Sequence, residues 1–182
     1  MNSRPSDIDI TVTTLNPGAS AGFLECAGLR FPCALGRGGL TSRKLEGDGA
    51  TPLGRWQLRH AWYRPDRISR PRTGLPLKVI KPQDGWCDAP GDRNYNRPVN
   101  HPYPASAEHL WRKDHLYDLV VAIGYNDLPR SRGRGSAIFM HVAGPNMAPT
   151  EGCVALRRDD LIRLISLIGP STQLHIGPYH WR

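Results

Sequence analysis

The sequence predicts a mainly β fold of the α+β class, with one helix near its C-terminal end. The 19 Gly and 17 Pro residues interrupt the 182-residue chain every few positions, a pattern that favours short strands and turns over a helical bundle. Residues 161–168 carry apolar side chains at helical spacing, which predicts the helix. Because no internal repeat, low-complexity tract or linker interrupts the chain, we expect one domain over residues 1–182.

Strands are predicted throughout the N-terminal half. In residues 8–14, Ile8, Ile10 and Val12 alternate with polar side chains, which indicates a half-buried strand. A hairpin is expected next, with its turn at Ala27-Gly28, and a glycine-rich turn follows it. The strands expected after the first one cover residues 22–26, 29–35, 55–62 and 77–80.

The C-terminal half combines a long loop, a strand pair and the helix. Residues 86–107 are rich in Pro, Asn, Asp and Tyr and follow neither periodicity, so they predict a long ordered loop. Continuous apolar runs at 116–125 and 137–142 predict a central pair of strands. Asp159 and Asp160 are expected to open the helix and Gly169-Pro170 to end it, before a closing strand around Leu174 and Ile176.

Charge and composition limit the partner classes without selecting one. Lys and Arg exceed Asp and Glu by 24 to 16, which gives a formal charge of +8 and favours anionic partners such as nucleic acid or the carboxylates of peptidoglycan. No stretch approaches the roughly 20 apolar residues of a membrane span, and no signal peptide is visible at the N-terminus. The sequence leaves the oligomeric state and the export route open.

Four cysteines occur, and their spacing argues against structural zinc, since there is no CxxC pair and no zinc-finger pattern. If Cys153 stays a free thiol, at most one disulfide can form among Cys26, Cys33 and Cys87. Whether any of them pair is left open.

A candidate nucleophile and base lie near the C-terminus. Cys153 follows Gly152 in a turn, and a thiol attacks only as thiolate, so it needs a base or a positive charge nearby. His141 is the nearest candidate in sequence, and strand alternation places it on the same face as Phe139. The eleven residues between the pair are enough for a loop that brings the two side chains together.

The backbone N–H groups of Gly152 and Cys153 are the expected donors to an oxyanion, since glycine permits unusual dihedrals and leaves room for a substrate. Two structural alternatives stand beside this catalytic interpretation. A single cysteine is often a small buried hydrophobe, and a single histidine in a strand is often a hydrogen-bonded core residue.

These motifs resemble the L,D-transpeptidases with the YkuD-type catalytic domain. The family signature, a strand-borne histidine followed by Ser/Thr-x-Gly-Cys, corresponds to His141 and to Thr150-Glu151-Gly152-Cys153. The family's upstream Thr-Pro-x-Gly turn is matched within residues 47–54. Further similarity, typical of a proteobacterial branch, runs through residues 36–37, 86–88, 95–96 and 133–141.

The resemblance implies a YkuD-like β-sandwich with a terminal helix after the cysteine turn, acting in the periplasm or cell envelope. In such a domain the cysteine attacks an L,D peptide bond of a donor stem peptide, and an amine of an acceptor stem resolves the thioester. Peptidoglycan stem peptides are then the partners, without nucleic acid, metal or organic cofactor. The implied catalytic residues are Cys153, His141 and Gly152.

Substrate contacts are expected from Thr150, Glu151, Arg132, Arg134 and Tyr125. Of these, Glu151 suits a substrate ammonium group, and the two arginines suit stem carboxylates. Many family members carry His at the position of Glu151, and Arg or Asn at that of Ala155, so the donor bond is left open. Two other functions stay open as well: an L,D-carboxypeptidase or hydrolase on the same scaffold, and a non-catalytic basic module that binds cell wall or nucleic acid.

Overall fold

The computed structural model describes residues 8–178 and is mainly β, with one α-helix near its C-terminal end, as predicted. A 3₁₀ turn, η1 (Pro145–Met147), precedes the last strands, and the helix is α1 (Arg158–Ile165). The strands are β1 (Ile10–Thr14), β2 (Ala21–Cys26), β3 (Leu29–Ala34), β4 (Leu40–Thr41), β5 (Thr51–Pro52), β6 (Gly54–Tyr63), β7 (Leu77–Val79), β8 (Asp84–Cys87), β9 (Arg97–Asn100), β10 (Ala107–His109), β11 (Leu119–Ile123), β12 (Phe139–Val142), β13 (Val154–Leu156) and β14 (Gln173–Pro178).

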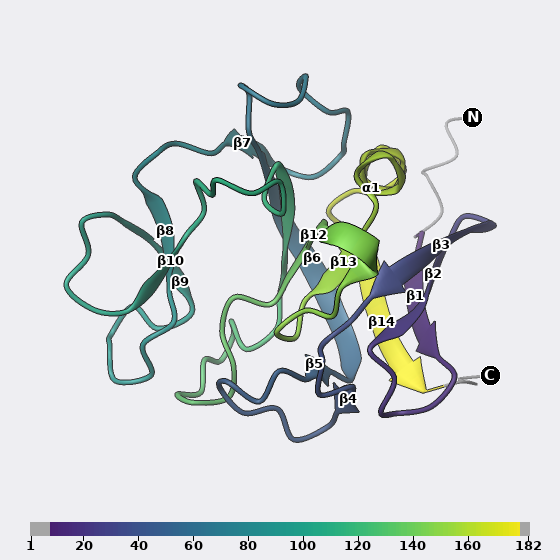
Figure 1. Cartoon of the computed structure of the whole chain (residues 1–182), viewed down its shortest axis with the longest axis horizontal. Coiled ribbons are helices and arrows are strands. Elements are labelled where there is room, and N and C mark those ends of the chain that lie inside the picture. Colours follow the sequence, from purple (N-terminus) through teal and green to yellow (C-terminus); the bar gives the residue numbers. More distant parts are fainter. Residues whose placement is uncertain (1–7, 179–182) are drawn as a thin grey trace.

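The main sheet curls until its ends meet. Its strand order is β11-β12-β13-β3-β2-β1-β14-β6-β7, and β6 also pairs with β11, so the layers of the sandwich join into a closed ring (Figure 1). Strand β1 runs parallel to β14, with Ile10 beside Leu174, which places the first and last strands of the described chain side by side. The pairing of β6 with β11 leaves no free edge within the ring.

The predicted N-terminal strand and hairpin are present. Ile10 and Val12 are buried and Thr11 is exposed, as their alternation predicts. Ala27 and Gly28 both have positive φ, 48° and 76°, the pattern of the tight turns that match strand twist in hairpins. The register pairs Cys26 with Leu29, and Cys26, Cys33, Cys87 and Cys153 are all free thiols.

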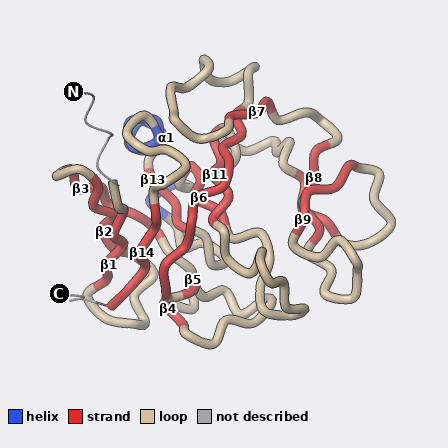
Figure 2. The backbone as a smooth tube through the Cα atoms, turned by 180° about the vertical axis from the view of Figure 1, so that it is seen from behind, coloured by secondary structure: helices blue, strands red, loops and turns tan. Residues whose placement is uncertain are grey.

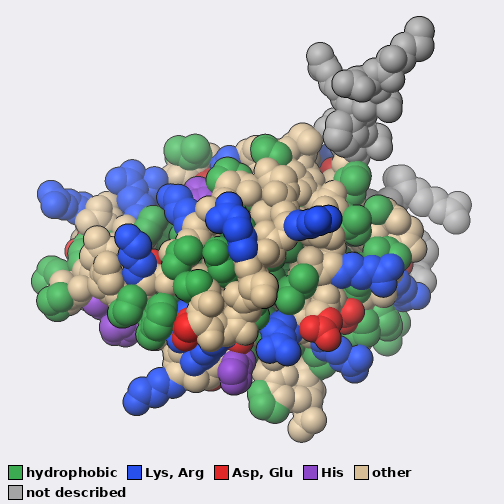
Figure 3. All heavy atoms as spheres, turned by 90° about the horizontal axis from the view of Figure 1, so that it is seen from above, with side chains coloured by type: hydrophobic (Ala, Val, Ile, Leu, Met, Phe, Trp, Pro, Cys, Tyr) green, Lys and Arg blue, Asp and Glu red, His purple; other side chains and the backbone are tan. Residues whose placement is uncertain are grey.

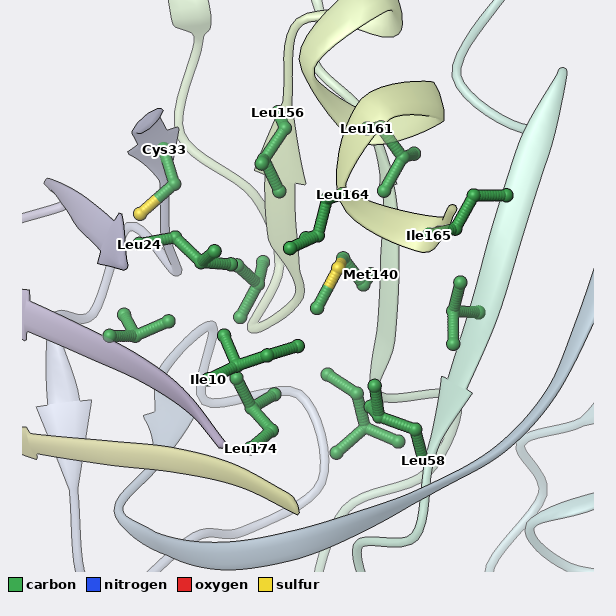
Figure 4. Close-up of a cluster of buried hydrophobic side chains, with 14 of the residues drawn as sticks. Ile10, Leu24, Cys33, Leu58, Met140, Leu156, Leu161, Leu164, Ile165 and Leu174 are labelled. Carbon is green, nitrogen blue, oxygen red and sulfur yellow. The ribbon is translucent and has the colours of Figure 1, made fainter. Parts of the chain in front are cut away.

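The main core fills the ring, and the helix contributes to it. Leu161, Leu164 and Ile165 of α1 are fully buried and belong to the same core as Met140 of β12 and Leu156 of β13 (Figure 4). Helix α1 begins with two acidic residues in its first turn, which suits the helix dipole. It ends at Ile165, before the predicted end, because the N–H of Leu167 bonds to the carbonyl of Leu164 and tightens the chain into a turn.

Strand β11 is buried on both faces, which explains its continuous apolar run. Its side chains alternate between two cores: Val121 belongs to the main core, and Val120 to a second cluster on the outer face of the ring. This second cluster also contains Trp62, Ile80, Leu110, Tyr117, Ala122, Phe139 and Cys153. The candidate nucleophile, Cys153, therefore lies on the outer face of the ring, within this second cluster.

The prediction of a long loop over residues 86–107 is wrong in part, because the region supplies most of a separate small sheet. Strands β8, β9 and β10 pair in the order β10-β8-β9 and lie away from β1–β3 (Figure 2). Each has only three or four residues, too few to show alternation. Pro98 within β9 also reads as a loop signal, but it occupies an edge strand, where proline is tolerated.

None of the helices within residues 8–178 has both the length and the apolar composition needed to cross a membrane.

Candidate active site

Strand β12 holds His141 on the outer face of the ring, as its alternation predicts. Met140 and Val142 point into the main core, whereas Phe139 packs in the second cluster. The His141 side chain is nearly buried, with 5% of its surface exposed. Its imidazole meets the ring of Tyr117 edge to face, with 5.4 Å between the ring centroids.

A backbone carbonyl defines the tautomer of His141. The Nδ1 atom lies 2.8 Å from the carbonyl oxygen of Val142. Because a carbonyl can only accept, Nδ1 carries the proton, and Nε2 presents its lone pair. Burial lowers the pKa of His141 to about 4, so the imidazole is neutral at neutral pH and can accept a proton.

The turn before β13 carries Cys153. Strand β13 runs parallel to β12 with Ala155 beside His141, so Cys153 comes two residues earlier on the same face. Its Sγ lies 3.3 Å from the Ala137 carbonyl oxygen, and the Phe139 N–H donates to it over 3.4 Å. Burial raises the pKa of the thiol to about 12, and the Phe139 N–H opposes that rise. The resting thiol is therefore neutral.

Cys153 and His141 line the same cleft, which has a volume of about 620 Å³. Other lining residues include Leu116, Tyr117, Ser136, Ala137, Gly144, Pro145, Ala148, Pro149 and Thr150. Its charged lining is mostly acidic: Arg112 faces the five carboxylates Glu46, Asp88, Glu108, Asp114 and Glu151. In a chain of formal charge +8, this is a local reversal of sign.

Thr150 and Gly152 build the cysteine turn. The Thr150 hydroxyl donates to the Cys153 carbonyl over 2.7 Å and accepts the N–H of Gly152 over 3.2 Å. Gly152 has φ of +126°, and a Cβ at this position would lie 2.7 Å from the Ala50 carbonyl oxygen, so no larger residue fits without a shift. The Gly152 N–H predicted to serve an oxyanion is thus engaged in the turn. The Thr150 side chain holds the same turn, and because Thr150 also lines the cleft, its predicted contact with substrate stays a prediction.

Glu151 lies at the mouth of the cleft and forms an exposed ion pair with Arg37. Arg37 follows Gly36, which forms a bridge with Thr150, and the Arg37 N–H donates to the Thr150 carbonyl. The glycine-rich turn and the cysteine turn are therefore joined directly. A substrate ammonium group at Glu151 would have to compete with the Arg37 guanidinium.

Three predicted substrate contacts lie elsewhere. The Tyr125 hydroxyl donates to the backbone carbonyl of Arg134 over 2.7 Å, and both residues line a separate pocket that also contains Trp56. Arg132 is exposed in the neighbouring turn. The structure therefore does not bring Tyr125, Arg132 or Arg134 to the cleft that holds Cys153, and a substrate role for them stays a prediction.

Sequence reasoning missed Tyr117, Glu108 and Arg112, which line the cleft beside His141. The Tyr117 hydroxyl donates to Glu108 Oε1 over 2.7 Å, and Arg112 lies 3.4 Å from the same oxygen. Burial raises the pKa of Glu108, and the Tyr117 hydrogen bond opposes the rise. No motif spacing connects these residues to His141, because they come from β10 and from the loop before β11.

A neutral imidazole and a thiol on one cleft form the pair that enzymes with a cysteine nucleophile use. The family model described as the L,D-transpeptidase catalytic domain, YkuD, matches residues 27–176, so the chain belongs to the L,D-transpeptidase catalytic-domain family. The resemblance seen in the motifs is therefore confirmed. The proteobacterial branch stays a prediction.

Two solved structures illustrate the similarity. One is LdtMt1 in complex with imipenem, with 12% identity and a TM-score of 0.44 over 94% of this chain and 59% of that one. The other is L,D-transpeptidase 1 of Mycobacterium tuberculosis, with 11% identity and a TM-score of 0.39 over 93% and 60%. The chain thus spans about three fifths of the length of these structures. No curated protein matches it.

Proposed function

We propose that this chain is an L,D-transpeptidase that cross-links peptidoglycan stem peptides through a thioester on Cys153. One observation carries the proposal: within a chain of this family, Cys153 and His141 line one cleft. The proposal places the enzyme in the cell envelope, where its substrate lies, and treats residues 1–182 as one catalytic domain.

Acylation begins with proton transfer from the Cys153 thiol to Nε2 of His141. The thiolate sulfur attacks the carbonyl carbon of the L,D peptide bond in the donor stem, and the carbonyl oxygen becomes an oxyanion. As this intermediate collapses, the C–N bond breaks, the leaving amine takes the proton from His141, and a thioester remains on Cys153.

Deacylation repeats these steps with an acceptor amine. His141 removes a proton as the amine attacks the thioester carbon, the C–S bond breaks, and the new amide leaves with the acceptor stem. The thiolate then recovers its proton from His141. Thiol, imidazole and two stem peptides account for every bond and proton, so the proposal needs neither a metal nor an organic cofactor.

Backbone groups support the developing charges. The Phe139 N–H points at Cys153 Sγ and favours its thiolate form. We assign the Cys153 N–H as a donor to the oxyanion, whereas the Gly152 N–H would first have to leave the Thr150 hydroxyl. The acidic lining of the cleft attracts an acceptor that approaches as an ammonium ion, which releases one proton to water before its neutral amine attacks the thioester.

Purified disaccharide-peptide monomers provide the test. The protein is incubated with them, and products are identified by mass spectrometry, with Cys153→Ala as the matched inactive variant. Cross-linked dimers that require Cys153 support the transpeptidase. Shortened monomers without any dimer would instead identify a hydrolase. If the unaltered protein forms neither product and Cys153→Ala keeps every activity of the unaltered protein, the non-catalytic binding module is favoured.

A further inference from the structure

A buried tyrosine packs against the proposed base. Tyr117 precedes β11 and has 5% of its surface exposed. Its ring and the imidazole of His141 make an angle of 67°, and it also meets Phe139 edge to face with 6.0 Å between the centroids. Pairs of this geometry are attractive and directional. The position of Tyr117 therefore restricts how the imidazole can tilt.

A chain of charged groups in turn holds Tyr117. Its hydroxyl donates to Glu108 Oε1 over 2.7 Å, and burial raises the phenol pKa well above its ordinary value, so the hydroxyl remains a donor. The Arg112 guanidinium lies 5.1 Å from the centre of the tyrosine ring and 3.4 Å from Glu108. Asp114 binds Arg112 through both carboxylate oxygens, at 2.9 and 2.7 Å.

Arg64 anchors this network to the main sheet. Arg64 follows β6, donates to the Arg112 carbonyl over 2.8 Å, and stacks on Trp111 at 3.6 Å. Glu108 and Arg112 are thus tied to the main ring as well as to Tyr117. Such a network suits a side chain that must be held at one angle.

The hydrogen bond from His141 Nδ1 to the Val142 carbonyl leaves the imidazole one rotational freedom. It fixes the position of Nδ1, but the ring can still tilt about that bond, which moves Nε2 on the opposite side of the ring. Tyr117 meets the imidazole from a second direction. Two contacts from different directions define the plane of the imidazole, where one alone does not.

We propose that Tyr117 is a positioning residue for His141, and that its hydrogen bond to Glu108 fixes the angle at which Nε2 faces the Cys153 thiol. The inference rests on the proposed function only in taking His141 as the base that activates Cys153. It requires no contact between Tyr117 and a stem peptide.

The experiment compares Tyr117→Phe, Tyr117→Leu and Glu108→Gln with the unaltered protein. Cross-linking kinetics give kcat and KM, and iodoacetamide alkylation of Cys153, located by mass spectrometry, reports activation of the thiol without any stem peptide. Loss of the hydroxyl or of its acceptor is expected to lower kcat and the alkylation rate about tenfold, and loss of the ring about a hundredfold, with KM little changed. In ¹⁵N spectra, the His141 signals should broaden or shift in all three variants, and most in Tyr117→Leu.

Tyr63→Phe and Tyr63→Leu are the matched controls. Tyr63 is equally buried, with 6% of its surface exposed, but lies in the main core on β6. Its variants should lose stability while kcat per folded molecule and the His141 signals stay unchanged.

The inference is overturned if the Tyr117 variants lose activity only in proportion to their folded fraction and the His141 signals do not change. If the unaltered protein makes no dimers while the Tyr117 variants still slow alkylation and change those signals, the proposed function fails and the positioning role stands.

Discussion

His141 and Cys153 are both kept uncharged by burial, which lowers the pKa of the first to about 4 and raises that of the second to about 12. Desolvation disfavours whichever form carries charge, so the base holds a proton poorly and the acid holds one tightly. The thiol therefore gains nucleophilic character only when a proton moves to the imidazole. Attack and proton transfer are expected to be coupled.

The pH dependence of kcat/KM tests this electrostatic picture. The proposed base, His141, can accept a proton only when it is neutral, and its lowered pKa keeps it neutral down to about pH 4. The acid limb attributable to this base should therefore lie near pH 4, whereas a histidine with the unperturbed pKa of about 6.5 would already be protonated at pH 5. Rates at saturating and at limiting substrate, measured on protein shown to remain folded, provide the check. An acid limb near pH 6.5 would contradict the assignment.

Gly152 is required by both its dihedral angle and its surroundings. In Gly152→Ala, the new Cβ would meet the Ala50 carbonyl at 2.7 Å in a backbone of φ +126°. We expect a loss of about 2 to 4 kcal/mol in the free energy of unfolding, and a fall in turnover of about a hundredfold, because the cysteine turn must move. Urea unfolding and the dimer assay measure the two effects.

Gly28→Ala is the matched control for that substitution. Gly28 also has positive φ, +76°, but a Cβ there would meet nothing within 4 Å. It should cost only the dihedral strain, about 1 kcal/mol, and leave turnover unchanged. Equal effects of the two substitutions would show that crowding at Ala50 is unimportant.

At the level of elements, Asn96 connects the small sheet to the loops that lead into β12. Its Oδ1 accepts from the Trp86 indole N–H over 2.9 Å and from the Ala137 N–H over 3.1 Å. Its Nδ2 donates to the Tyr125 and Asn126 carbonyls. Because the Ala137 carbonyl contacts Cys153 Sγ, the attachment of the small sheet also supports the position of Cys153.

Asn96→Asp tests this connection with almost no change of shape. The substitution replaces the donor that faces two backbone carbonyls by a carboxylate oxygen, so we expect a loss of about 3 kcal/mol in the free energy of unfolding. The alkylation rate of Cys153 should change with it. Asn100→Asp, at an exposed position on β9, is the control and should have little effect. Similar stability of the two variants would exclude a structural role for the Asn96 amide.

At the level of the whole molecule, a chain of positive net charge has an acidic cleft. Lys and Arg side chains are spread over the face seen in Figure 3, and the formal charge of the chain is +8. Under the proposed function, the carboxylates of peptidoglycan stems are expected to attract this surface to the polymer, and the cleft is expected to attract the ammonium of an acceptor. The two signs of charge would act at different stages of one reaction.

Attachment to purified sacculi should therefore depend on salt. The bound fraction in a sedimentation assay is expected to fall severalfold as the salt concentration is raised from about 0.01 M to about 0.5 M, since the Debye length shrinks from about 30 Å to a few ångströms. Cys153→Ala should bind as the unaltered protein does, because it keeps every charge. Salt-independent sedimentation would show that surface charge does not drive the attachment.

Prediction from sequence succeeded where a local pattern was long enough to recognise. The alternation around Val12, the turn at Ala27-Gly28 and the apolar faces of β12 all lie within a few residues of chain. It failed for the small sheet, whose strands are too short for a period to appear. Sequence-based prediction also missed Tyr117 and Glu108, since no local sequence pattern shows which residues an aromatic or acidic side chain contacts in the folded chain.

The mainly β class, the family, and the thiol and imidazole that the proposed chemistry requires could all be recognised in the order of residues along the chain. The folded chain was needed to learn that Gly152 gives its N–H to Thr150, that carboxylates line the cleft, and that Tyr117 meets His141. These two kinds of information differ in range. Backbone periodicity is set by neighbouring residues, whereas contacts between side chains from different elements exist only after the ring has closed and the small sheet has packed against it.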